Sequence, residues 1–72
     1  MLTVQQFVEA CKSLNSEMIY DLFYDASDEL RDAIFAEVEG TLGVVLEHEN
    51  EPTRASMYAL GVKYNVQSLR DY

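Results

Sequence analysis

The chain has 72 residues and a formal net charge of −8, from 13 acidic and 5 basic residues. This charge argues against binding DNA, RNA or an anionic membrane through the overall field, and it favours encounters with basic proteins. One cysteine and one histidine allow no internal disulfide and no zinc site of the usual kind.

We expect one small acidic domain over residues 1–72, supported by helix packing or oligomerisation, and its first helix over residues 4–14. The apolar residues of this helix recur with the three-four spacing of one helical face: Val4, Phe7, Val8, Cys11 and Leu14. Thr3 and Gln6 have the spacing of a capping box. Cys11 lies within the apolar stripe, which favours a core residue over a reactive thiol.

Two further helices are predicted at residues 17–26 and 28–39, with Ser16 and Ser27 as their N-caps. The apolar stripe of the second helix comprises Met18, Ile19, Leu22 and Phe23. The apolar positions of the third helix are Leu30, Ala33, Ile34, Phe35 and Val38. These positions extend around more than half of the circumference of the third helix, which predicts that it is central in the bundle or has one face on a partner.

Residues 40–47 allow two predictions. In the first, the third helix extends to residue 47 with a break at Gly40 and Gly43, each of which costs about 1 kcal/mol in a helix interior. In the second, a short separate helix or strand follows Gly40. The first is favoured because a lone strand has no partner strand in this chain.

After a polar loop, the last predicted helix covers residues 53–65, with Thr53 as its N-cap and Asn65 at its end. Its predicted core face comprises Met57, Leu60, Gly61 and Tyr64. Gly61 would permit the close approach of a neighbouring helix. Residues 66–72 are expected to form one more turn or a frayed tail. The predicted fold class is therefore all-α, a small bundle of about four helices.

The C-terminal segment carries Ala59-Leu60, Lys63-Tyr64 and Leu69 at intervals along two short apolar stretches. In this spacing it resembles the first half of a helix-turn-helix, and also the C-terminal helix pair of BTB-type interaction domains. The first resemblance has no recognition helix after it, and the second has no strands upstream of it, so we carry no function over from either and assign no family.

Acidic residues concentrate across the second and third predicted helices, with two tyrosines among them. The candidate partner-binding residues are Tyr20, Asp21, Tyr24, Asp25, Asp28, Glu29 and Asp32. The commonest explanation of such a cluster is a solvated face with carboxylates at helix N-termini. The alternative is a recognition surface for a basic protein. Tyrosines favour it because they are enriched at interfaces, and a basic partner would relieve the repulsion between the carboxylates.

No motif indicates catalysis, a metal or a cofactor. A calcium loop needs a glycine at its turn, and the acidic run from Asp25 to Phe35 has none. The segment from Gly40 to Gly43 lacks the lysine of a phosphate-binding loop, and His48 reads as an exposed loop residue. We therefore expect no enzyme, no catalytic residue, no metal and no cofactor.

The leading functional hypothesis is a small acidic protein that binds another protein, an inhibitor or adaptor of the kind that phages and mobile elements encode. Its face from Asp21 to Asp32 would dock a basic groove of the partner, with Tyr20 and Tyr24 as anchors. In the strongest form it mimics nucleic acid and occupies the partner's nucleic-acid site, without binding nucleic acid itself.

The alternative is an assembly module that self-associates through the apolar side chains of Phe23, Phe35 and residues 44–46, while the acids keep it soluble. A homodimer is compatible with either hypothesis. Because the sequence shows no transmembrane run and no signal peptide, we expect a cytoplasmic protein without membrane contact.

Overall fold

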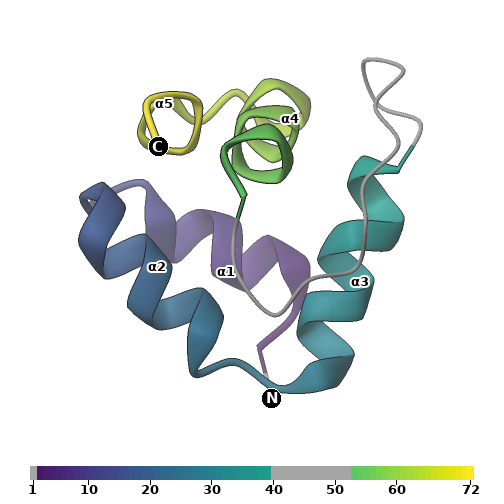
Figure 1. The fold of residues 1–72 in the computed structure, drawn as a ribbon. Helices are drawn as coiled ribbons and strands as arrows, with labels where there is room; N and C mark the ends of the chain where they lie inside the picture. The colour runs from purple at the N-terminus through teal and green to yellow at the C-terminus, as the bar shows by residue number, and fades with distance from the viewer. Residues whose placement is uncertain (1, 40–52) are drawn as a thin grey trace.

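The computed structural model of the chain describes residues 2–39 and 53–72, and these residues form five helices. Figure 1 shows α1 (Val4–Cys11), α2 (Ser16–Tyr24), α3 (Asp28–Val38), α4 (Arg54–Tyr64) and α5 (Gln67–Arg70). The predicted all-α fold is confirmed, with a short fifth helix where the sequence allowed one more turn. The two predictions for residues 40–47 lie outside the described residues.

Side chains cap four of these helices at their N-termini. Thr3 and Gln6 form the predicted capping box, in which the Gln6 N–H donates to Thr3 Oγ1 over 3.1 Å and the Thr3 N–H donates to Gln6 Oε1 over 2.9 Å. Thr53 caps α4 in a second capping box, and Ser27 caps α3, both as predicted. Local sequence is therefore sufficient to set the start of these three helices.

The N-cap of α2 differs from the prediction by one residue. Asn15 caps the helix, and its Oδ1 accepts from the Met18 N–H over 2.9 Å. Asn and Ser cap helices about equally well, so their adjacent positions gave no local basis for choosing between them. The end of α1 also differs from the prediction, because this helix ends at Cys11 rather than at residue 14. A tight turn follows, in which the Leu14 N–H donates to the Cys11 carbonyl over 3.2 Å.

The helices lie in two groups. In Figure 1, α1 crosses the middle of the molecule, with α2 on one side of it and α3 on the other. The pair α4 and α5 lies together above them, with α4 against α1 and α3 and with α5 against α2. This arrangement puts α3 at the side of the molecule rather than at its centre, and it encloses the core between the two groups.

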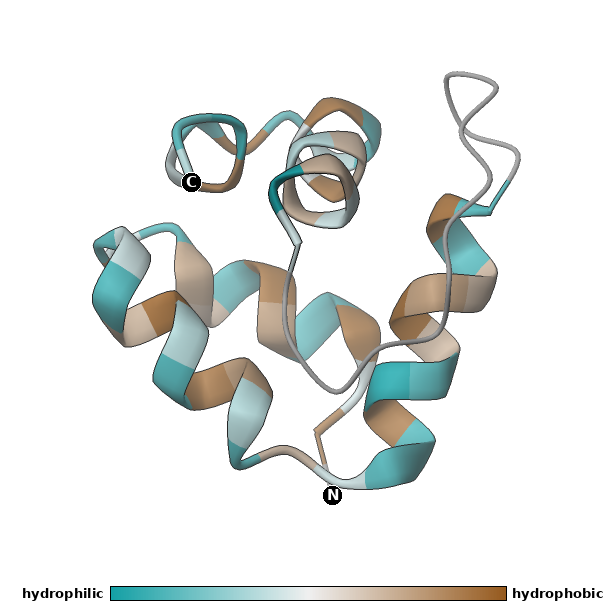
Figure 2. Ribbon diagram, in the orientation of Figure 1, coloured by the Kyte–Doolittle hydropathy of each residue, from teal (hydrophilic) through white to brown (hydrophobic). Residues whose placement is uncertain are grey.

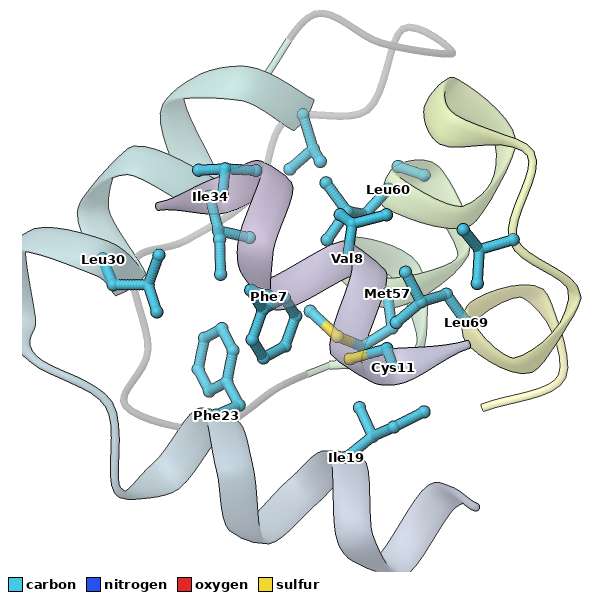
Figure 3. Close-up of a cluster of buried hydrophobic side chains, with 14 of the residues drawn as sticks. Phe7, Val8, Cys11, Ile19, Phe23, Leu30, Ile34, Met57, Leu60 and Leu69 are labelled. Carbon is cyan, nitrogen blue, oxygen red and sulfur yellow. The ribbon is translucent and has the colours of Figure 1, made fainter. Parts of the chain in front are cut away.

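The core is made by apolar side chains from all five helices. Its largest fully buried members are Phe7, Phe23, Phe35, Ile19, Ile34, Met57, Leu60, Leu69, Val38 and Cys11. Figure 3 shows part of this core, with Phe7, Phe23 and Cys11 among the labelled side chains. Leu69 belongs to α5, so the C-terminal segment is packed into the core and is not a frayed tail. The predicted core face of α1 is confirmed, apart from a half-buried Leu14.

The apolar stripes of α2 and α3 are narrower than predicted. Met18 is 52% exposed, because the side of α2 that faces the core is centred on Ile19 and Phe23. Ala33 is exposed as well, although Leu30, Ile34, Phe35 and Val38 of the same helix are buried.

Two residues assigned to the self-association hypothesis are inside the domain. Phe23 is 0% exposed and Phe35 is 2% exposed, so neither side chain is available to a second copy of the folded chain. The phenyl rings instead contact each other edge-to-face, with centroids 5.9 Å apart. Residues 44–46, the other part of that hypothesis, lie outside the described residues.

The buried thiol of Cys11 predicts a loss of stability in alkaline solution. Burial raises its pKa from an ordinary 9.0 to about 12. A raised pKa in the folded state means that the stability contribution is complete below pH 9 and is lost as the pH rises toward 12. Over that window we expect wild type to lose about 1.4 kcal/mol per pH unit relative to Cys11→Ala.

Urea denaturation of both proteins at several pH values between 8 and 11 measures this difference. Tyr64, whose pKa is also raised by its hydrogen bond to Glu37, is present in both proteins and cancels in the comparison. Parallel stability curves for wild type and Cys11→Ala would contradict a thiol that stays protonated in the core.

Candidate partner-binding surface

Helix α2 presents the first part of the candidate surface. Because Ile19 and Phe23 hold one side of α2 against the core, the opposite side faces outward. Asp21, Tyr24 and Asp25 are exposed on that side. The predicted residues of α2 therefore lie together on the molecular surface.

Tyr20 and Tyr24 form a stacked pair one helical turn apart. Their ring centroids are 6.0 Å apart and the ring planes differ by 10°. Tyr20 is half-buried, whereas Tyr24 is 56% exposed. Stacking on a partly buried ring restricts the rotamers of Tyr24 before any partner arrives, which lowers the entropy cost of using it as a contact.

The first turn and a half of α3 supplies the remaining carboxylates. Asp28, Glu29 and Asp32 are all exposed, and Figure 2 shows the start of this helix as hydrophilic. Asp28 and Glu29 lie in the first turn, where the helix dipole stabilises negative charge. We call the predicted partner-binding carboxylates, all of them exposed, the acidic face; it comprises Asp21, Asp25, Asp28, Glu29 and Asp32.

Arg31 stabilises the turn between α2 and α3, the two helices that carry the acidic face. Its guanidinium donates to the carbonyl oxygens of Tyr24 over 3.0 Å and Ala26 over 2.7 Å, and it pairs with the Asp28 carboxylate. The side chain is only 15% exposed. Arg31 thereby holds the end of α2 against the start of α3, so the carboxylates have a fixed spacing across the turn.

This role of Arg31 was not predicted from the sequence. The available signal was its position as the single base within the acidic run, three residues after Asp28, where a helical ion pair forms. The contacts with the end of α2 depend on how the chain turns at residues 25–27, which residue spacing alone does not specify.

The acidic face keeps an excess of negative charge. Within residues 2–39 and 53–72, the carboxylates of Asp21, Asp25 and Glu29 have no basic partner. Lys12 pairs instead with Glu9 over 2.9 Å, and Lys63 with Glu37 over 3.3 Å. Lys12, Lys63 and Arg31 are thus used elsewhere or in holding the turn, and leave the carboxylates of Asp21, Asp25 and Glu29 available for an external cation.

The described part of the chain contains neither a metal site nor a membrane-spanning helix. No group of three or more His, Cys, Asp or Glu side chains there is arranged to hold a metal ion. None of the helices described is long and apolar enough to cross a membrane. His48, predicted to be an exposed loop residue, lies outside the described residues.

Comparison of the chain with protein-family models, curated proteins and solved structures finds no match.

Proposed function

We propose that this protein is a non-catalytic binding module whose acidic face docks a basic surface of a partner protein. In the fullest form of this proposal the partner surface binds nucleic acid, and the module competes for it as an inhibitor or adaptor of the type encoded by phages and mobile elements. The interaction is between proteins, and the module itself contacts neither nucleic acid nor membrane.

The observation that carries the proposal is the exposed, stacked Tyr24 beside carboxylates that have no basic partner in the described residues. Charged residues alone are enough to keep a surface solvated, and an exposed, ordered aromatic ring adds nothing to solvation. Interfaces combine the two, with a tyrosine as the contact that dominates affinity and charged residues around it. Tyr24 and the acidic face have this composition.

The two kinds of residue would contribute differently. Exposed ion pairs are worth about 0.2–1 kcal/mol each, and they act mainly on the association rate and on partner choice. Burial of an aromatic anchor such as Tyr24 is worth about 2 kcal/mol or more when it is a hot spot. Binding should therefore weaken with rising salt without being abolished by it.

Neutralising the acidic face tests the proposal directly. The partner is first captured from a bacterial lysate on the immobilised protein, identified after elution in steps of rising salt, and purified. We expect the triple variant Asp25→Asn, Asp28→Asn and Asp32→Asn to weaken its binding roughly 10- to 100-fold, chiefly through a slower association rate. Circular dichroism checks that the variant is folded.

A matched control separates the acidic face from net charge alone. Glu9→Gln, Glu39→Gln and Asp71→Asn neutralise three exposed carboxylates elsewhere, and so change the net charge of −8 by the same amount. This control should bind within about two-fold of wild type. Equal losses in both triple variants would contradict a specific acidic face. If both triple variants bound the partner as tightly as wild type at every salt concentration, the interaction would have to use another surface of the protein. Displacement of bound DNA or RNA from the partner would support the nucleic-acid form of the proposal.

A further inference from the structure

Two shallow hollows lie beside the turn that joins α2 and α3. The segment that precedes α1 lies next to this turn (Figure 1). One has a volume of about 270 Å³ and reaches Val4, Glu29 and Ala33. The other has a volume of about 220 Å³ and reaches Asp25 and Ala26. Leu2 and Leu30 line both hollows, so the two are neighbouring parts of one groove.

The walls of this groove are mainly apolar. Leu2 is 39% exposed, which leaves a substantial part of a large apolar side chain open to solvent. Leu30 is 3% exposed and belongs to the hydrophobic core, so the groove is continuous with the core. Ala33 contributes a small exposed methyl group. An apolar side chain placed here would be removed from water on several sides.

Each part of the groove has a carboxylate in its wall. Asp25 lines one hollow and Glu29 lines the other, and neither pairs with a base in the described residues. Both also belong to the acidic face. The groove therefore combines an apolar floor with two negative charges, which favours an occupant with apolar and basic groups close together.

The volume restricts the occupant further. Taken singly, each hollow is smaller than the about 300–1,000 Å³ that is usual for the pocket of a drug-sized ligand. A single leucine-sized side chain is a better match for such a space than a cofactor. The negative rim disfavours nucleic acid and anionic lipid headgroups.

We propose that the groove receives a basic segment of the partner protein, in which an apolar side chain sits on Leu2 and Leu30. Lysine or arginine residues on either side of that side chain meet Asp25 and Glu29. This inference rests on the proposed function and specifies the partner's docking element: basic residues flanking a leucine-like residue. It also predicts that charge alone is insufficient for binding.

A pair of synthetic peptides tests the apolar requirement. The first peptide has one leucine flanked by two lysines on each side, and the second has serine in place of the leucine. Both are titrated into the full, ¹⁵N-labelled chain and followed by NMR. We expect the leucine peptide to shift the amide signals of Leu2, Leu30 and Ala33. Its affinity should exceed that of the serine peptide about ten-fold or more, because only leucine gains from apolar burial.

Two alanines of α3 provide a matched pair of variants. Ala33 and Ala36 are both exposed on this helix, but only Ala33 lines the groove. Ala33→Lys fills the groove and adds a positive charge there, whereas Ala36→Lys adds the same charge to the same helix outside it. Ala33→Lys should weaken binding of the leucine peptide about ten-fold, and Ala36→Lys by about two-fold or less.

Equal affinities for the two peptides, together with equal effects of the two lysine variants, would contradict the proposal that the groove receives an apolar side chain of the partner. The proposed function would survive that result if neutralising the acidic face still weakened binding of the captured partner. A protein that is dimeric by analytical ultracentrifugation, and that Ala33→Lys converts to a monomer, would also overturn the inference, since the occupant would then be a second copy of the chain. If the captured partner bound the acidic-face triple variant as tightly as it binds wild type, the proposed function itself would be contradicted.

Discussion

Replacing Phe23 with alanine is expected to lower the free energy of unfolding by about 3–5 kcal/mol, the usual cost of truncating a buried phenylalanine. Phe23 is 0% exposed and lies between two other rings. Its centroid is 6.2 Å from that of Phe7, with the planes at 71°, and 5.9 Å from that of Phe35, with the planes at 83°. Both contacts have the edge-to-face geometry that aromatic pairs favour.

This ring joins three helices, which explains the size of the expected effect. Phe7 belongs to α1, Phe23 to α2 and Phe35 to α3, so truncation removes contacts on both neighbouring helices and leaves a cavity between them. Figure 3 shows the rings of Phe7 and Phe23 beside each other. A domain of this length has a total stability of roughly 4–11 kcal/mol. The loss is therefore a large share of the total, and partial unfolding of the variant at 37 °C is expected.

Urea denaturation followed by circular dichroism measures the change, with Tyr24→Ala as the control. Tyr24 is the adjacent aromatic residue of the same helix, but it is 56% exposed and contacts mainly Tyr20. Its truncation should cost about 1 kcal/mol or less. If the two substitutions were equally destabilising, the orientation of α2 about its own axis would have to differ from that described.

The parts of this fold that sequence could predict are those determined within one helical turn. Thr3, Ser27 and Thr53 cap their helices through hydrogen bonds to residues three positions later, so their spacing contains the necessary information. The three-four spacing of the apolar residues likewise identified the buried side of α1. Asn65 ends α4 in the left-handed conformation, with a φ of 57°, which asparagine tolerates better than most residues.

Features that depend on packing between helices were not predictable in the same way. Met18 has the right spacing for the α2 stripe, yet it is exposed because the buried side is centred elsewhere. The burial of Leu69 follows from the position of α5 on α4, and no local pattern specifies that position. The same holds for the site. Residue type and spacing indicated the acidic face, whereas the groove exists only because Leu2 is brought beside the α2–α3 turn.

Gly61→Ala is expected to destabilise the protein by about 2 kcal/mol, although alanine is favoured over glycine by about 1 kcal/mol in a helix interior. The reason is the close approach of α5 to α4. A Cβ atom at position 61 would lie 2.7 Å from the backbone nitrogen of Arg70 and 2.9 Å from Leu69 Cβ. A backbone atom cannot rotate away as a side chain can, so α5 would have to move.

Movement of α5 would release the apolar side chains that hold it. Leu69 is 0% exposed and Val66 is 3% exposed, and burial of each such side chain is worth about 1.5–3 kcal/mol. The free energy lost when these side chains are partly exposed exceeds the free energy gained from the higher helix propensity of alanine. The substitution is therefore expected to destabilise the protein. The hydrogen bond from the Val66 N–H to the Gly61 carbonyl, 2.9 Å long, is at the same junction and would also be strained.

Val62→Ala is the matched control for this prediction, because Val62 is the next residue of α4 and is 37% exposed. Its change in unfolding free energy should lie within about 0.5 kcal/mol, the usual range for surface substitutions. Hydrogen exchange adds a local measurement, in which the Arg70 and Asp71 amides should lose protection in Gly61→Ala before those of α1 do. A Gly61→Ala protein more stable than wild type would mean that propensity outweighs the contact, and hence that α5 does not rest on α4 at this glycine.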